Sequence, residues 1–290
     1  MKLRTVFVLV FILLLAVDVQ GQLLWRISGN GLSKNSYLFG THHLIDKGLI
    51  PQFDSILALC GQTDAVVGEM DLKTSGMQKK MMDESLMKDK KIKDLVSASD
   101  YKLLDSEFKS VVGLGMSVLG SFKPMMLMSM HQIFLYLKST GSKKPPTAVD
   151  ELFQKQARAD GRKVVGLETM EFQMNVLFNS IPLERQAELL LNEVHQKEQM
   201  LKDLRELNSI YISGDLEKMK ELDVDDKSMK PEERKMLVED RNMNWMSQLP
   251  TLMKAQSCFV AVGCMHLVGE IGLINQLRLK GYTVDPVLFK

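Results

Sequence analysis

Short apolar runs alternate with longer amphipathic stretches along most of this chain. Six of these runs are rich in β-branched or aromatic residues and are bounded by turn-forming residues, a pattern typical of β-strands. They span residues 23–29, 36–41, 64–71, 164–169, 258–263 and 282–287. The first two flank the turn-forming sequence NGLSKN and are predicted to form a hairpin. Several of the later runs are continuously apolar inside, as expected for strands that are covered on both faces.

Helical periodicity fills the chain between these predicted strands. Single amphipathic helices are predicted at residues 51–62, 149–163 and 270–281. Two longer helical blocks, interrupted by Pro and Gly, cover about 73–147 and 171–252. Strands that alternate with helices predict an α/β (α+β) fold, in which a central β-sheet is flanked by large helical blocks. We expect residues 22–290 to form a single domain, with the two blocks as helical insertions.

The first residues have the features of a secretory signal peptide. Lys2 and Arg4 precede an apolar run over residues 6–17, and residues 19–21 place short side chains where a signal peptidase reads them. The run is shorter than the ~20 residues that a membrane-spanning helix needs. We therefore expect residues 1–21 to be removed and the mature chain to be exported to the periplasm or the extracellular space, without a membrane span. An uncleaved N-terminal anchor is the alternative.

Charge and cysteine content argue against some classes of protein. The 37 basic and 36 acidic residues nearly balance, which gives no support for nucleic acid or an anionic membrane surface as a partner. The three cysteines, Cys60, Cys258 and Cys264, are too few for a fold held together by disulfides. Either Cys60 pairs with one of the other two, or the cysteines are buried thiols.

Chemically versatile side chains follow four of the predicted strands. They are His42 and His43 after the second run, Glu69 after the third, Glu168 after the fourth and His266 after the fifth. Both histidine segments read G-x-x-H, in which the glycine allows the backbone to turn sharply. Since open α/β sheets bind ligands beyond the carboxyl ends of their strands, we predict that these side chains converge in one strand-end active site.

Such a set of side chains is suited to a divalent metal ion. Two imidazoles with one or two carboxylates can hold the ion and leave a position for water, whose pKa the metal would lower. A second carboxylate would act as a general base or orient a ligating histidine. These residues alone leave open whether His42 or His43 faces the site. Each residue taken singly is also consistent with a hydrogen-bonded structural histidine or a helix-capping glutamate.

Several segments resemble the TraB/PrgY/GumN family, which includes the Tiki metalloproteases. The opening LLWRISG…SYLFGTHH is similar to the family's hairpin and G-T-x-H motif, and VVGEMD is similar to its acidic strand. AVDELFQKQARADGRKVVGLETMEFQ is similar to its central segment, and EDRNMNWM to its Arg-Asn helix. The ending FVAVGCMHLVGEIGLINQLRLKGYTVDPV is the most specific piece, with Cys264 at a position where the family often has Ala. The resemblance covers nearly the whole mature chain and implies a fold like that of erythromycin esterase and related haem-uptake proteins.

The resemblance also implies which residues would hold a metal. It assigns the histidine of the G-T-x-H motif to His43, so that His43, Glu69 and His266 would be the ligands. His42 would then lie in the surroundings of the site.

The resemblance implies supporting roles for residues outside this ligand set. Glu168 would be a general base or support a ligand, and Arg241 would steady an oxyanion or a substrate carboxylate. Asp150 and Asn242 match further positions of the family pattern and would bind substrate or support the site. Gln173 also matches a position of the family's central segment.

The resulting hypothesis is an exported metal-dependent hydrolase, in its leading form a peptidase that acts on peptide or protein substrates. The metal would be Mn, Co or Zn, which the sequence does not distinguish. One alternative is a binding protein that captures haem or metal on the same fold without turnover. Another is a metal-free esterase in which a histidine acts as general base.

Overall fold

A six-stranded mixed sheet forms the centre of the computed structural model, which describes residues 22–225 and 229–289. The strand order is β4–β3–β5–β2–β1–β6. The strands are β1 (Leu24–Gly29), β2 (Ser36–Thr41), β3 (Ala65–Gly68), β4 (Lys163–Gly166), β5 (Cys258–Gly263) and β6 (Tyr282–Pro286). Each coincides with one of the six predicted apolar runs, although β4 begins one residue before its run. The predicted mixed α/β class is confirmed.

Four neighbouring strands are parallel and end along the same edge of the sheet, β3 and β4 two residues before β2 and β5. In the pairing of β4, β3 and β5, Gly68 lies opposite both Gly166 and Ala261. In the pairing of β2 and β5, Thr41 lies opposite Gly263. β1 runs antiparallel to both of its neighbours, β2 and β6, and its pairing with β2 is the predicted hairpin. The residues that follow β2, β3, β4 and β5 therefore emerge along one edge of the sheet.

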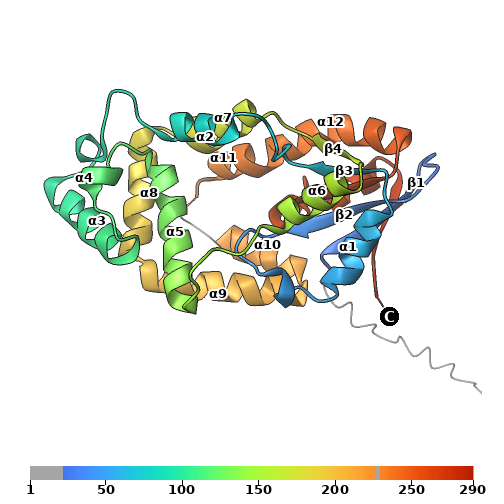
Figure 1. Ribbon diagram of the computed structural model, residues 1–290, viewed down its shortest axis with the longest axis horizontal. Helices are drawn as coiled ribbons and strands as arrows, with labels where there is room; N and C mark the ends of the chain where they lie inside the picture. Colours follow the sequence, from blue (N-terminus) through green and yellow to red (C-terminus); the bar gives the residue numbers. More distant parts are fainter. Residues whose placement is uncertain (1–21, 226–228, 290) are drawn as a thin grey trace, which may run out of the picture.

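Helices occupy the connections between the strands (Figure 1). Between β2 and β3 lie the 3-10 turn η1 (Lys47–Leu49) and α1 (Phe53–Gly61). Between β3 and β4 lie α2 (Met77–Ser85), η2 (Ile92–Asp94), α3 (Ala98–Val111), α4 (Met116–Leu119), α5 (Pro124–Thr140) and α6 (Val149–Ala159). Between β4 and β5 lie α7 (Met170–Asn179), α8 (Leu183–His195), α9 (Lys197–Ser213), α10 (Leu216–Asp225), α11 (Pro231–Arg234), the π-helical turn η3 (Lys235–Glu239) and α12 (Asp240–Ala255). The 3-10 turn η4 (Cys264–His266) and α13 (Leu273–Leu279) join β5 to β6.

The main hydrophobic core lies between the sheet and the helices that cover it. Phe153 of α6 packs on the sheet, with its ring centroid 4.7 Å from that of Phe259 in β5 and 5.3 Å from that of Phe39 in β2. All three rings are fully buried, and burying an aromatic side chain is a large contribution to stability. This packing fixes α6 against the parallel strands.

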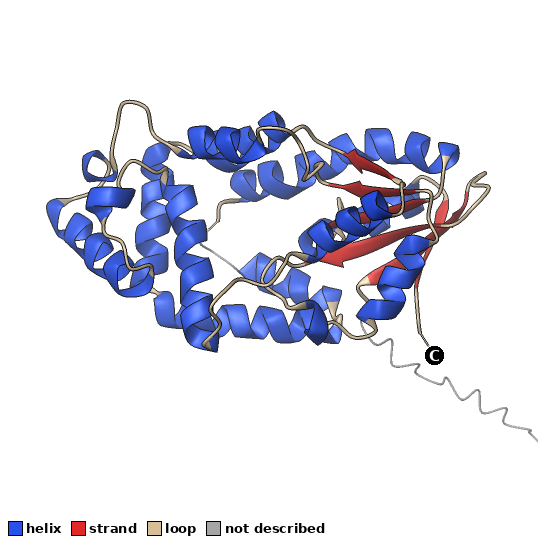
Figure 2. Cartoon of the chain, viewed as in Figure 1, coloured by secondary structure: helices blue, strands red, loops and turns tan. Residues whose placement is uncertain are grey.

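A second hydrophobic core lies within the helical part of the molecule. Figure 2 shows α3, α4, α5 and α8, which Figure 1 labels, at the end of the molecule away from the sheet. Buried side chains of these helices and of η2 form a cluster of their own: Ile92, Leu104, Phe108, Met116, Leu119, Leu127, Leu190 and Val194. The two helical blocks predicted from periodicity thus pack against each other, since α5 from the first contacts α8 from the second.

The sequence predicts a signal peptide at the N-terminus and no membrane span in the mature chain. The predicted signal peptide, residues 1–21, lies outside the described residues. None of the described helices is long and apolar enough to cross a membrane.

Cys60, Cys258 and Cys264 are all buried free thiols. Burial raises the pKa of Cys264 to about 12, so this thiol next to the strand-end site is protonated at neutral pH.

Candidate active site

The ends of the parallel strands bring three of the predicted residues together. Glu69 directly follows β3, and His266 is the last residue of η4, just beyond β5. Nε2 of His266 lies 3.9 Å from Oε1 of Glu69, and the backbone N–H of Gly263 donates to the same carboxylate oxygen at 2.9 Å. The backbone N–H of Glu168, which lies just beyond β4, donates to the carbonyl of Glu69 at 2.8 Å. The predicted convergence at this edge of the sheet is therefore observed for Glu69, Glu168 and His266.

Glycine is required where β3 and β4 end. A Cβ on Gly68 would lie 2.6 Å from Nε2 of Gln154, and a Cβ on Gly166 would lie 2.7 Å from the backbone nitrogen of Asp71. Both distances are shorter than Cβ atoms tolerate. At Gly166 the neighbouring atom belongs to the backbone and cannot swing aside, so the spacing between the segments that follow β3 and β4 depends on this glycine.

Arg241 of α12 links the three strand-end residues. Its Nε and Nη2 donate to the two carboxylate oxygens of Glu168, both at 2.9 Å, in a bidentate pair. Nη2 also donates to Oε2 of Glu69 at 2.6 Å. Nη1 donates to Nε2 of His266 at 3.3 Å and to the carbonyl of Leu237 at 3.2 Å. A guanidinium has five N–H groups, and these five contacts give each of them a partner.

The next turn of α12 adds a further contact to this cluster. The indole N–H of Trp245 donates to Oε1 of Glu168 at 2.8 Å, and the Arg241 guanidinium lies 4.9 Å from the centroid of the Trp245 ring. The side chain of Glu168 is 0% exposed, and both of its carboxylate oxygens accept hydrogen bonds. In this arrangement Glu168 anchors Arg241, which fits the supporting role predicted for it more closely than the role of general base.

Hydrogen bonds define the tautomer of His266. Because an arginine N–H can only donate, Nε2 of His266 accepts from Arg241 through its lone pair. The ring proton is then on Nδ1, which donates to Oδ1 of Asn242 at 2.8 Å. The amide nitrogen of Asn242 donates to the carbonyls of His266 and Ile271, which fixes the orientation of the amide. The lone pair of Nε2 thus faces the Arg241 guanidinium, on the same side of the ring as Glu69, and not the solvent or Asn242.

Burial and the neighbouring charges set the protonation of the cluster. Burial lowers the pKa of His266 to about 4, with Glu69 opposing this shift and Arg241 adding to it. Burial alone would raise the pKa of Glu69, but His266, the Arg241 guanidinium and the N–H of Gly263 bring that pKa below its usual value. At neutral pH, His266 is therefore neutral and Glu69 is ionised.

The two adjacent histidines lie in different surroundings. Nδ1 of half-buried His42 accepts the backbone N–H of Leu44 at 3.1 Å, and its ring stands edge-on to Tyr211 at 5.3 Å between centroids. Burial, with a smaller effect of His43, lowers the pKa of His42 to about 4. The His43 side chain is 67% exposed, and its Nδ1 lies 3.8 Å from Oδ1 of Asp150. The two imidazoles thus have different partners, although His43 lies in a turn and not in the extended segment that the sequence suggested.

Two buried oxygen atoms on residues that match the family pattern have no hydrogen-bond partner in the described part of the chain. They are Oδ1 of Asp150 and Oε1 of Gln173. Gln173, on α7, donates its amide N–H to Oε2 of Glu69 at 3.0 Å, so its free oxygen lies next to the cluster. Unsatisfied buried acceptors cost stability, and acceptors in these positions are suited to a cation or a hydrogen-bond donor from a ligand.

Three further residues support the site and were not identified from the sequence. Trp245 follows Arg241 by one helical turn, and a search for polar residues at i and i+4 on the Arg-Asn helix would have found it. The same spacing relates Gln154 to Asp150 on α6. Gln154 holds the segment after Glu69, because it donates to the carbonyl of residue 70 at 2.9 Å and accepts the N–H of residue 72 at 3.0 Å. Tyr211 donates to the carbonyl of Gly40 at 2.8 Å, a contact that no sequence pattern indicates.

The chemistry of the cluster fits a bound cation. The cluster already surrounds a cation, the Arg241 guanidinium. It does so with the carboxylates of Glu69 and Glu168 and the Nε2 lone pair of His266. The third predicted ligand, His43, has no ion pair or hydrogen bond with Glu69 or His266 in the described part of the chain. Over the described residues, no three His, Cys, Asp or Glu side chains gather closely enough to hold a metal ion. The metal ligand set His43, Glu69 and His266 therefore stays a prediction.

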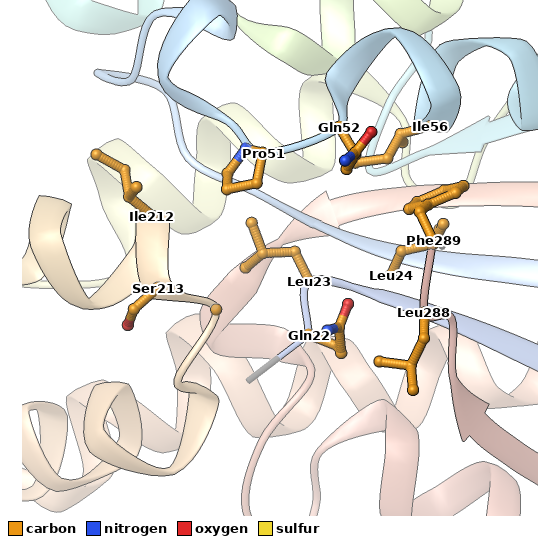
Figure 3. A pocket seen from close by; sticks show the side chains of 11 residues that line it. Gln22, Leu23, Leu24, Pro51, Gln52, Ile56, Ile212, Ser213, Leu288 and Phe289 are labelled. Atoms are coloured by element: carbon orange, nitrogen blue, oxygen red, sulfur yellow. The ribbon is translucent and has the colours of Figure 1, made fainter. Parts of the chain in front are cut away.

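A separate pocket of about 250 Å³ lies at the start of β1 (Figure 3). Its lining comes from the start of β1, the beginning of α1, the end of α9 and residues 288 and 289. The lining residues are Gln22, Leu23, Leu24, Pro51, Gln52, Ile56, Ile212, Ser213, Gly214, Leu288 and Phe289. None of these residues carries a charge, so this pocket offers no group for acid–base or metal chemistry, and the strand-end cluster remains the candidate active site.

Comparison with known protein families finds a match that covers most of the chain. A model of the TraB/PrgY/gumN family matches residues 23–286. The matched range contains all six strands and every residue of the strand-end cluster. Searches of the curated proteins and of the solved structures found no match.

Proposed function

Because the chain belongs to the TraB/PrgY/gumN family, we propose that its strand-end cluster is the active site of an exported, metal-dependent hydrolase that cleaves peptide bonds. The observation that carries the proposal is the buried, cation-binding arrangement of Glu69, Glu168 and His266 at the ends of three parallel strands. Buried carboxylates and a neutral imidazole around a cation are costly to maintain for stability alone, and perturbed groups of this kind concentrate at functional sites.

His43, Glu69 and His266 would hold the metal in this proposal. The bound ion would polarise the scissile carbonyl and lower the pKa of a water molecule. Asn242 keeps the Nδ1 proton of His266 in place, so that the lone pair of Nε2 stays directed into the site. Asp150, whose Oδ1 lies 3.8 Å from Nδ1 of His43, is placed to orient that imidazole in the same way.

Glu168 and Arg241 would supply the charge balance of the site. Glu168 is held by Arg241 and by the indole of Trp245, so we assign it to the support of Arg241. A guanidinium close to Glu69 and His266 is positioned to stabilise negative charge that develops on a substrate oxygen. That role requires one of the five occupied N–H groups to exchange its present partner for the substrate.

A metal-free hydrolase is the second candidate, and one observation favours it. The Arg241 guanidinium already neutralises the carboxylates without a metal, and Nε2 of His266 becomes a base once this guanidinium releases its lone pair. In that case His266 would take a proton from water without a metal. Haem or metal capture without turnover, the remaining sequence-based alternative, has no observation in its favour among the described residues.

Metal analysis combined with a peptide-library cleavage assay tests the proposal. The mature wild-type protein is purified, its metal content is measured, and isothermal titration with Mn²⁺, Co²⁺ and Zn²⁺ is performed on wild type and on His43→Ala, Glu69→Gln and His266→Ala. We expect cleavage that is lost on chelation and restored by one of the ions, and metal affinity that falls by about tenfold or more in each variant. Cleavage that survives complete chelation would favour the metal-free hydrolase. Equal metal affinity in wild type and in His43→Ala and His266→Ala would rule out the ligand set.

A further inference from the structure

The guanidinium of Arg241 occupies the lone pair that a metal ion would need on His266. A neutral imidazole has one acceptor nitrogen with one lone pair. In His266 that nitrogen is Nε2, because the proton of Nδ1 is donated to Asn242. Nη1 of Arg241 lies 3.3 Å from Nε2 and donates to it. The same guanidinium also contacts Oε2 of Glu69 at 2.6 Å through Nη2.

We infer that Arg241 is a built-in competitor for the metal site, so that a divalent ion binds His266 only when the guanidinium gives up its contact with Nε2. This inference rests on the metal site proposed above. Arg241 then has different partners in the metal-free and metal-bound forms. The affinity for metal is reduced by the free energy needed to break its contact with Nε2 of His266.

The contacts of Arg241 allow it to leave His266 without becoming unpaired. Its Nε and Nη2 form a bidentate pair with Glu168, which is itself held by the indole N–H of Trp245. This part of the interaction does not involve either proposed ligand. The remaining Nη1 contact is to the carbonyl of Leu237 in the π-helical turn η3, and π-helical turns are frequent at functional sites. Glu168 can therefore retain the arginine while Glu69 and His266 take a different cation.

Charge makes simultaneous occupation unfavourable. A divalent ion bound to Nε2 of His266 would lie within a few ångströms of the guanidinium in a site where Arg241 is 6% exposed. Two like charges at such a distance repel strongly in a buried environment. Removing the guanidinium should therefore strengthen metal binding, in contrast to the loss expected for any residue that ligates the metal.

The test compares the metal affinity of wild type and Arg241→Met by isothermal titration with Mn²⁺, Co²⁺ and Zn²⁺. We expect Arg241→Met to bind at least one of these ions about tenfold more tightly than wild type. The matched control is Arg185→Met. Arg185, on α8, also pairs with a buried glutamate, since its Nε lies 2.9 Å from Oε1 of Glu233 on α11. The control should leave metal affinity at the wild-type value.

Arg241→Met leaves Glu69 and Glu168 without their guanidinium, so the variant risks failing to fold. The double variant Arg241→Met/Glu168→Gln removes one charge of each sign and keeps both ligands, Glu69 and His266. It is tested by titration and by the increase in Tm that each ion produces. Tighter binding in either variant supports the inference. If the wild type binds a metal ion and both variants bind it equally or more weakly, the inference is overturned and the proposed metal site stands. Absence of metal binding in wild type and both variants would overturn the metal site and the inference together.

Discussion

At the scale of single residues, His42 and His43 show how one peptide bond separates two environments. His42 packs edge-on against Tyr211 and accepts a backbone hydrogen bond, whereas His43 is exposed beside Asp150. His42 thus has the contacts of a structural histidine, and His43 has a free imidazole edge. The division arises where β2 has ended and the chain turns at His43.

Substitution of each histidine should separate these roles. We expect His42→Ala to lower the free energy of unfolding by about 1 kcal/mol, because the ring contact with Tyr211 is lost, while metal affinity is retained. His43→Ala should leave stability nearly unchanged and remove metal binding. Urea unfolding and isothermal titration on both variants measure the two effects. The reverse pattern, with metal binding lost only in His42→Ala, would assign the ligand to the other histidine.

Gly166 provides a second test at this scale. A Cβ at this position would meet the backbone of Asp71 at 2.7 Å, whereas a Cβ at Gly61 in α1 would meet no atom within 4 Å. We expect Gly166→Ala to destabilise the protein by about 1–3 kcal/mol, because β3 and β4 would have to move apart. Gly61→Ala should change the stability by less than about 1 kcal/mol. Thermal unfolding of both variants checks the contrast, and equal stability of the two would contradict it.

The candidate residues that the sequence could predict are those that directly follow strands. Glu69, Glu168 and His266 meet because parallel strands in register end at one edge, and apolar runs reveal where strands end. The sequence could not show that every N–H group of Arg241 has a hydrogen-bond partner, because these contacts depend on how α12 is placed over that edge. The separation of His43 from Glu69 likewise depends on side-chain orientation, which the G-T-x-H motif does not specify.

At the scale of elements, a buried histidine ties three helices of the helical part together. His131 of α5 is fully buried, with Nδ1 2.7 Å from Oε1 of Glu193 on α8 and Nε2 3.3 Å from Oε1 of Glu107 on α3. Lys197 of α9 donates to Glu107 at 2.8 Å, and Gln132 of α5 donates to Glu193 at 2.6 Å. Periodicity predicted the helices, but it could not show that charged residues from separate helices would meet inside their shared core.

This cluster should make stability fall as the pH rises from about 6.5 through the folded pKa of His131. Burial alone would lower the pKa of His131, but the hydrogen bonds and charges of Glu193 and Glu107 raise it above its ordinary value. A histidine whose pKa is raised by folding contributes its full stabilisation below pH ~6.5, the unfolded value, and loses it as the pH rises through the folded pKa. We expect the free energy of unfolding to decrease over this range in wild type.

Urea unfolding between pH 5 and pH 9 measures the effect. In His131→Gln the decrease should be smaller, because the group that loses its proton is absent. His195→Gln, which removes an exposed imidazole at the end of α8, is the control and should retain the wild-type dependence. An identical pH dependence in wild type and His131→Gln would contradict the interpretation.

At the scale of the whole molecule, the chain can be tested for export. The sequence predicts cleavage after Gly21, which would make Gln22 the first residue of the mature protein. We expect N-terminal analysis of protein secreted by an expressing cell to begin at Gln22, or at its cyclised form. Retention in the cytosol would refute the proposed export, whereas a secreted chain that still begins at Met1 would refute the cleavage after Gly21.

The place of β1 in the sheet has a consequence for how the protein is made. β1 lies between β2 and β6, and it pairs with β6 from Trp25 opposite Pro286 to Gly29 opposite Tyr282. A ribosome that has synthesised the first five strands has therefore left one edge of β1 with unpaired backbone groups, which invite contact with other chains. Contacts between residues so distant in sequence also form slowly. This edge of β1 is therefore covered only after the last strand of the chain has been made.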